Sequence, residues 1–474
     1  MAEHPRAAFA LLGATQVSLI ATITLITLAL PTIQRELGIS RAELALLSAA
    51  YGLSFSGLLL FGGRLADVLG PRLVLGAGVA VFGLASGVAA LSPTFPVLIF
   101  ARFSEGVGAA LAAPAALALV GSVFPDAGRR ARAFAVWGVL AGIGAISGTL
   151  LGGAVVSFVA WRWTFALPAA TATVALFAAP RVLPPGPAPQ RTQLDVPGAL
   201  LATVGTSALS YGLLATLDRP PGSVSVVLPL VGGATLLGAF VAVERRTRLP
   251  LVPLSLLGSW WRATALVAVL LAAAGTATMT FFSSLYFQQS RGLSPLETSA
   301  ALVPYALILL ATGFLAPRVL GRLGPRATTA VGLFVGAGGL ALLSQLTLRS
   351  PYVGALLIGL LVFAVGVALT FSGATVAALE GVADTQAGVA GGVVNTALET
   401  GPTVGLAVLV SLAGAHAAEL RAGGSGAAAA TVGGYGFALA VASVAFAGAG
   451  ALATLALGRQ RDPAQIDNPV GGAP

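Results

Sequence analysis

The stretch GGRLADVLGPR, at residues 62–72, decides the fold that we predict for this chain. It is a charged turn, punctuated by glycine, between two long apolar segments, and the stretch APRVLGRLGPR at residues 316–326 repeats it. At an offset of 254 residues the copies share Arg64/Arg318, Leu69/Leu323, Gly70/Gly324, Pro71/Pro325 and Arg72/Arg326. A helix–loop–helix unit that occurs twice in one membrane chain predicts two related halves, an arrangement typical of alternating-access transporters.

The composition is that of an integral membrane protein. Of the 474 residues, 57% are hydrophobic and only 9% are charged, whereas about 25% of the residues of a soluble protein are charged. The apolar segments repeatedly approach the roughly 20 residues that a helix needs to cross the bilayer. We therefore expect an all-α membrane protein and not a barrel of short alternating strands.

Residue types that the sequence lacks exclude several classes of function. There is no cysteine, so disulfides and thiolate metal sites are excluded, and all 25 basic residues are arginine, which removes the lysine of a Walker-type phosphate loop. No paired carboxylates, histidine cluster or nucleophile–base spacing favours an enzyme, and we expect neither a cofactor nor a metal. The net charge of +9 is spread over short loops, which favours membrane topology over binding of nucleic acid.

Fourteen apolar segments are long enough to cross the membrane as helices. They span residues 8–33, 44–63, 73–91, 95–118, 131–157, 163–180, 195–217, 224–243, 263–288, 297–317, 327–347, 352–378, 387–415 and 432–457. Because the number is even, both ends of the chain lie on one side. With both ends inside, the inner loops carry seventeen arginines and the outer loops seven, which predicts cytoplasmic termini in a bacterial inner membrane.

The spacing of the two copies predicts six plus two plus six helices. Two six-helix bundles in direct succession would bring the copies closer together, and the offset of 254 residues leaves room for two inserted helices at 195–217 and 224–243. We therefore divide the chain into a first bundle at 1–180, the inserted helices with their linkers at 181–262, a second, pseudo-symmetric bundle at 263–457 and a disordered cytoplasmic tail at 458–474.

Three motifs carry a resemblance to a known family. Gly63, Leu65, Ala66, Asp67, Gly70 and Arg72 match the loop pattern G-x-L-A-D-x-x-G-x-R. The run ARFSEGVGAA at 101–110 is similar to R-x-x-Q-G-x-G-A-A, and GIGAISGTLLGG at 142–153 is similar to an antiporter motif that ends in G-P-x-x-G-G, with Thr149 in place of the proline. In this combination the chain resembles the major facilitator superfamily and, within it, the fourteen-helix drug:proton antiporters.

The resemblance implies roles for the first and third motifs. Gly63, Asp67, Gly70 and Arg72 would form a cytoplasmic latch that holds one closed state; a solvated loop held inside by its positive charge is the alternative. The small residues Gly144, Gly148, Gly152 and Gly153 let the fifth helix approach a neighbour closely, either as plain helix packing or as the seal between the two halves.

Three charged residues lie well inside predicted spans, away from the span ends, where a charge is costly and usually serves a function. Arg102 and Glu105 lie three residues apart, so they face the same way and can pair. They are either a structural ion pair or a proton site, since desolvation favours the neutral carboxyl and a nearby arginine favours the charged one. Glu399 is a second proton site, an anchor for a cationic substrate or an acid at a helix end.

The first helix departs from the family pattern D-x-T-x-x-N-x-A-L-P. Thr22 stands where the family has the membrane acid and Thr27 where it has asparagine, whereas Glu105 stands where the family usually has glutamine. We hypothesise that the proton-carrying carboxylate has moved from the first helix to the fourth.

These features together predict a proton-coupled antiporter that exports hydrophobic or amphipathic small molecules such as drugs. Its partners would be that substrate, protons and the lipid bilayer, and we expect a monomer. A dedicated exporter of an endogenous metabolite or lipid, and an uncoupled or uptake facilitator, remain as alternatives; a non-transporting receptor is disfavoured because no soluble effector domain is present. Candidate residues of a central cavity are Gln16, Tyr51, Trp137, Phe281, Phe282, Tyr286 and Asn395.

Overall fold

The computed structural model describes residues 5–124, 126–184, 195–220, 222–247, 259–380, 382 and 387–457. Helices joined by short turns make up this described part of the chain. The predicted tail at 458–474, and parts of the linkers around Arg191, Arg248 and Asp384, lie outside it.

The helices follow one another in three groups, which match the predicted segments closely. The first group is α1 (Pro5–Leu37), α2 (Arg41–Leu69), α3 (Pro71–Ala90), α4 (Phe95–Val123), α5 (Ala127–Phe158) and α6 (Trp163–Val182). The inserted pair is α7 (Val196–Ala215) and α8 (Val224–Glu244). The last group is α9 (Trp260–Leu285), η2 (Tyr286–Ser290), α10 (Pro295–Leu343), η3 (Tyr352–Leu356), α11 (Leu357–Leu379), α12 (Ala387–Ala422) and α13 (Ala427–Leu457).

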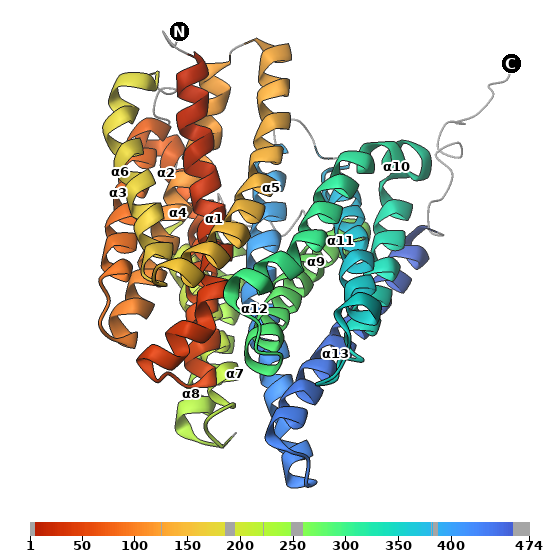
Figure 1. Ribbon diagram of the computed structural model, residues 1–474. Helices are drawn as coiled ribbons and strands as arrows, with labels where there is room; N and C mark the ends of the chain where they lie inside the picture. Colours follow the sequence, from red (N-terminus) through yellow and green to blue (C-terminus); the bar gives the residue numbers. More distant parts are fainter. Residues whose placement is uncertain are drawn as a thin grey trace, which may run out of the picture.

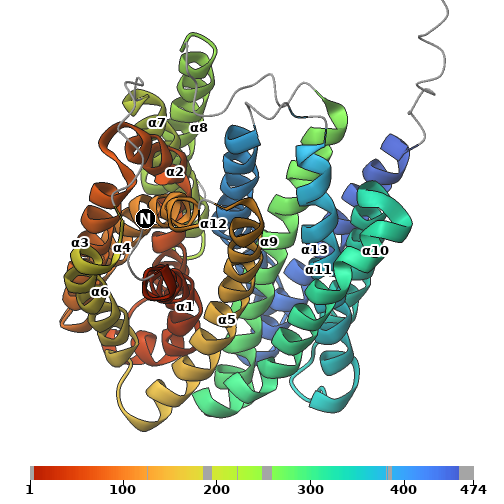
Figure 2. The same ribbon diagram turned by 90° about the horizontal axis from the view of Figure 1, so that it is seen from above.

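The first and last groups form two bundles that stand side by side, coloured red to yellow and green to blue (Figure 1, Figure 2). Two seams join them, one where α2 packs against α12 and one where α5 packs against α10. Helix α7 packs against both α2 and α12, and α8 packs against α7, so the inserted pair covers the first seam. The lipid-spanning character is plain from twelve described helices that are long and apolar enough to cross a bilayer.

The number of helices differs from the predicted fourteen, because the structure has thirteen α-helices in its described residues. The predicted segments 297–317 and 327–347 both lie in α10, which runs for 49 residues and has a non-helical residue at Gly324. No coil separates the two segments, because Pro325 starts the second one directly after Gly324. The count of fourteen membrane crossings therefore stays a prediction.

The duplicated turn has the same backbone conformation in both copies. Gly70 has a φ of 90° between α2 and α3, and Gly324, its counterpart 254 residues later, has a φ of 75°. This left-handed region is open to glycine because glycine has no Cβ. In each copy a proline follows and takes the first position of the next helical segment, where its missing N–H costs nothing.

The glycines of α5 have two different partners. Gly144, Gly148 and Gly152 all face the backbone of α1, so these three pack the first bundle internally. A Cβ added to Gly148 would lie 2.5 Å from the carbonyl oxygen of Ala21. Gly153 instead faces α10, where a Cβ would lie 2.9 Å from the carbonyl oxygen of Pro295. Of the four glycines described in this motif, only the last therefore contacts the other half.

The α1–α5 contact predicts a difference between two identical substitutions. Gly148→Ala should lower the free energy of unfolding by about 1–3 kcal/mol, because the added methyl group overlaps the α1 backbone. Gly87→Ala on α3 is the matched control, since a Cβ there meets no atom within 4 Å. Thermal unfolding of both variants in detergent measures the difference, and equal melting temperatures would contradict the packing argument.

Candidate functional site

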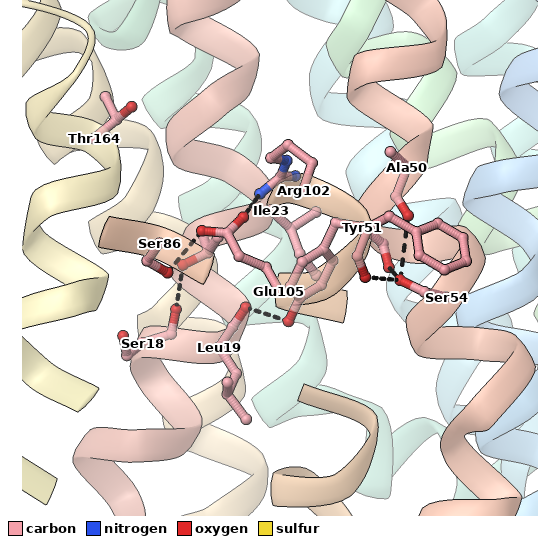
Figure 3. Close-up of polar contacts among 12 residues, drawn as sticks. Ser18, Leu19, Ile23, Ala50, Tyr51, Ser54, Ser86, Arg102, Glu105 and Thr164 are labelled. Carbon is pink, nitrogen blue, oxygen red and sulfur yellow. Dashed lines mark hydrogen bonds and ion pairs between the residues drawn. The ribbon is translucent and has the colours of Figure 1, made fainter. Parts of the chain in front are cut away.

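A buried ion pair lies in the middle of the first bundle (Figure 3). Arg102 and Glu105, one turn apart on α4, are joined by a 2.8 Å contact from Nη1 to Oε2. Their side chains are 1% and 0% exposed. The second carboxylate oxygen accepts a 2.7 Å hydrogen bond from the Ser86 hydroxyl of α3. Both oxygens of Glu105 therefore have partners, which is what a buried carboxylate requires.

Aromatic rings complete the surroundings of the arginine. The guanidinium carbon lies 5.1 Å from the centre of the Tyr51 ring on α2 and 5.9 Å from that of Phe165 on α6. Such rings attract a cation through their negative faces. The Tyr51 hydroxyl in turn donates to the carbonyl oxygen of Leu19 on α1, at 3.0 Å (Figure 3). Four helices of the first bundle thus meet at this pair, and Tyr51 links it to α1.

In α1, two threonines stand where the family pattern has an acid and an amide. Thr22 and Thr27 are both buried, and each hydroxyl donates to a carbonyl one turn earlier in α1, at 2.9 and 3.2 Å. The acid that α1 does carry, Glu36, accepts hydrogen bonds from Trp161 and Arg162 near the other end of the helix. Sequence reasoning did not find this contact, because its partners lie more than a hundred residues apart in the chain.

Glu399 lies on α12, at the seam with α2. Its side chain is partly exposed, and it lies close enough to Tyr51 for an electrostatic interaction. Within the described residues no hydrogen bond or ion pair of its carboxylate is found. The seam is tight on both sides of it, because a Cβ on Gly52 would lie 2.6 Å from Thr403 and one on Gly392 2.6 Å from Leu60.

A cavity of about 640 Å³ lies between the two halves at the other seam. Both bundles line it, since α1 and α5 contribute Thr24, Ala145, Ile146 and Thr149, and α9 and α10 contribute Thr276, Thr280, Tyr305, Leu309 and Phe314. None of the described lining residues is charged. Its size and apolar walls are those of a site for a drug-sized molecule.

The described lining of this cavity contains none of the seven residues that the sequence suggested. Tyr51 and Phe282 lie in the buried core, where Phe282 stacks on Tyr435 at 4.8 Å. Phe281 and Phe282 line a much smaller pocket of about 40 Å³ at the end of the bundles remote from the start of α1. The remaining candidates are placed as follows: Trp137 packs on Phe9, the Tyr286 hydroxyl donates to Thr347, the Gln16 amide oxygen is buried, and Asn395 is exposed.

The predicted latch makes its described contacts within one bundle. Arg72 donates to the carbonyl oxygen of Pro180 at the end of α6, at 2.6 Å, and Arg64 interacts electrostatically with Asp67 on the next turn of α2. Gly63 faces Pro114 of α4. In the second copy, Arg326 approaches Glu380 at 3.5 Å and lies 5.1 Å from the Trp261 ring. The latch role therefore stays a prediction.

Polar contacts join the two halves near the C-terminal end of α1. The side chains of Ser284 and Gln288 donate to the carbonyls of Thr27 and Leu28, at 3.0 and 3.3 Å. Gln289 donates to the side chain of Gln34 at 3.0 Å. At the α5–α10 seam Ser299 donates to the Thr149 carbonyl, at 2.9 Å. These contacts hold the two halves together at this end.

Comparison with known proteins gives concordant results. The family described as Major Facilitator Superfamily matches residues 12–406. Cephamycin export protein CmcT of Amycolatopsis lactamdurans is 37% identical over 396 residues, 82% of this chain and 81% of its own length. Puromycin resistance protein pur8 of Streptomyces alboniger is 36% identical over 412 residues, 86% of this chain and 82% of its own length.

Solved structures support the fold alone. The crystal structure of a bacterial homologue of the human lysosomal transporter Spinster, in an inward-facing and unoccupied conformation, superposes with a TM-score of 0.70. The alignment covers 97% of this chain and 99% of that chain at 14% identity.

The buried pair predicts strong coupling between its two members. Arg102→Ala should cost about 3–5 kcal/mol of stability, because it leaves Glu105 without its counter-charge in a low-dielectric interior. The double variant Arg102→Ala with Glu105→Gln should regain part of that loss, since it removes the stranded carboxylate. Thermal unfolding of the two single variants and the double variant in detergent gives the coupling energy. A double variant no more stable than Arg102→Ala would show that the charges are not coupled.

Proposed function

Because the chain belongs to the major facilitator superfamily, we propose that it is a secondary active transporter that exports hydrophobic or amphipathic small molecules, drugs among them, in exchange for protons. The observation that carries this proposal is the cavity between α5 and α10, which both halves line. The names of two relatives, a cephamycin export protein and a puromycin resistance protein, support a substrate of the antibiotic class.

We infer that the chain crosses the membrane fourteen times. A straight helix of the 49 residues of α10 would be about 73 Å long, at 1.5 Å per residue, whereas the hydrocarbon core is about 30 Å thick. The break at Gly324 divides α10 into two segments that each suit one crossing. With fourteen crossings and the arginine bias, both termini lie in the cytoplasm of a bacterial cell.

In this orientation the contacts around Gln34 and Gln289 close the cavity to the outside. Alternating access would open them and close the cytoplasmic end, with each bundle moving as a unit. Several of the contacts between the halves are hydrogen bonds from single side chains, those of Ser284, Gln288 and Ser299, to backbone carbonyls. Each such bond contributes only about 1 kcal/mol net. A substrate or proton that favours the other state by a few kcal/mol is then sufficient to shift the population.

The proton site we propose is Glu105, with Arg102 as its counter-charge and Glu399 as a second acid. Glu105 is sealed from solvent in this conformation, so exchange of its proton requires the bundle around it to open. Glu399 is partly exposed and lies close to Tyr51, the residue whose ring contacts Arg102. Tyr51 thus lies close to both acids.

An uncoupled facilitator is the second candidate, and one observation favours it. Glu36 is the only acid among the described residues of α1, and Trp161 and Arg162 already donate hydrogen bonds to it. If neither Glu105 nor Glu399 exchanges a proton, transport would be driven by the substrate gradient alone. A dedicated exporter of one endogenous product would share the proton coupling and differ only in accepting a single compound.

Transport in proteoliposomes tests the coupling. With puromycin as substrate and an imposed pH gradient, Glu105→Gln should reduce uphill transport at least about tenfold, the loss expected when a positioned proton-transfer group is removed. Exchange of labelled for unlabelled puromycin without a gradient should continue, because it needs no proton. Asp218→Asn, an exposed acid beyond α7, is the matched control and should leave both rates unchanged.

Uphill transport by Glu105→Gln at the wild-type rate would exclude Glu105 as the proton site. A wild-type protein that exchanges puromycin but never accumulates it under the pH gradient would favour a facilitator. Loss of exchange as well as uphill transport would assign Glu105 to folding or binding alone.

Cross-linking tests alternating access. The chain has no cysteine, so Gln34→Cys with Gln289→Cys introduces a unique pair at the outer closure. A short, reducible bis-thiol reagent should join the pair and abolish transport, and reduction should restore it. The single variants treated in the same way are the controls. Full transport activity with the cross-link in place would show that this contact does not open during the cycle.

A further inference from the structure

The cavity at the α5–α10 seam has a hydrogen-bonding pattern that selects its ligand. Five of its described lining residues carry a hydroxyl: Thr24, Thr149, Thr276, Thr280 and Tyr305. The rest are apolar or glycine, and no charged group is present among them. Specificity in an apolar pocket comes from the few polar groups that converge on it, so the state of these five hydroxyls matters.

The four threonines have already used their donor hydrogens. Thr149 donates to the carbonyl of Ala145, at 3.0 Å, and Thr24 reaches the carbonyls of Ala21 and Ala145 at 3.2 Å each. On α9, Thr276 donates to Ala272 and Thr280 to Thr276, both at 2.8 Å. A threonine hydroxyl has a single hydrogen, so these side chains can accept from a ligand but have no donor left for one.

Tyr305 is different, because its hydroxyl has no hydrogen-bond partner among the described residues. The side chain is 6% exposed, and its ring stacks on Phe363 with centroids 6.3 Å apart, which fixes its position. Thr276 is its polar neighbour but lies outside hydrogen-bond geometry. A buried hydroxyl without a partner costs about 1–3 kcal/mol, and a ligand acceptor that reached it would recover that loss.

We propose that this cavity binds uncharged, mostly apolar molecules that carry a hydrogen-bond acceptor, and that the Tyr305 hydroxyl donates to that acceptor. The inference rests on the proposed export function and names the substrate class of the same cavity. Cations have no counter-charge among the described lining residues, and ligands without an acceptor leave Tyr305 unpaired. Tyr305 is therefore a residue that determines specificity.

Two ligands that differ only at the acceptor test this proposal. Benzophenone is neutral and aromatic, carries one carbonyl oxygen and labels nearby C–H groups on irradiation; diphenylmethane has the same rings and no acceptor. In lipid nanodiscs, Tyr305→Phe should raise the half-saturating concentration of benzophenone labelling about tenfold, the effect of one lost hydrogen bond in a buried site. The inhibition constant of diphenylmethane in competition should not change.

Two further variants serve as controls. Tyr352→Phe removes a hydroxyl that donates to Ala301 outside the cavity lining, and it should leave benzophenone labelling as in the wild type. Gly313→Leu adds a side chain at the cavity wall, where a Cβ meets no atom within 4 Å, so the protein should fold and bind both ligands more weakly. Labelled peptides should map to α5, α9 and α10.

An unchanged half-saturating concentration in Tyr305→Phe, or an equal loss for both ligands, would overturn the role of Tyr305. Labelling confined to other helices, or undisturbed by Gly313→Leu, would overturn the site. These outcomes are independent of pH-driven export of puromycin, so a failure of the transport proposal and a failure of this one are distinguishable.

Discussion

A buried arginine and glutamate in lipid-spanning helices must neutralise each other, and this constraint organises the first bundle. Each ion alone would cost several kcal/mol to bury, so Arg102 and Glu105 stay within 2.8 Å, and Ser86 supplies the bond that the second carboxylate oxygen requires. The Tyr51 and Phe165 rings flank the guanidinium. Helices α2, α3 and α6 are thereby positioned around one turn of α4. Because α2 also packs against α12, the ion pair helps to fix the position of α2 at that seam.

The contacts inside a bundle differ in kind from those between bundles. In lipid no hydrophobic effect draws helices together, so α5 approaches α1 through Gly144, Gly148 and Gly152, where backbone meets backbone over three turns. Between bundles, the polar contacts are single hydrogen bonds such as those of Ser284 and Ser299. The first kind of contact lays backbone against backbone along a helix, whereas the hydrogen bonds of the second kind can be broken and remade one at a time. That difference is what rigid-body movement of two bundles requires.

The sequence was sufficient to predict the helices, the duplication and the Arg102–Glu105 pair, because these depend on local chemistry: apolar length, a glycine–proline turn, and spacing along one helix. It was not sufficient to predict the cavity lining. Helices that are apolar all round carry no periodic signal that tells lipid from cleft, so the aromatic residues chosen as candidates lie elsewhere, with Phe282 stacked on Tyr435. Tyr305 could have been found only from the three-dimensional partners of its hydroxyl, and Ser86 only from the packing of α3 on α4.

The positions of the acids and of the cavity constrain how exchange could work. In the function proposed above, the proton binds Glu105, which is fully buried, and the substrate binds a cavity whose described lining has no charge, so the two would not compete for the same atoms. Coupling must then pass through an element that both sites share. Helix α1 is such an element, because its Leu19 carbonyl accepts the Tyr51 hydroxyl beside the ion pair, and its Thr24, little more than one turn further on, lines the cavity and contacts α5. A change in the charge of Glu105 that moved Tyr51 would therefore reach the cavity wall through fewer than two turns of one helix.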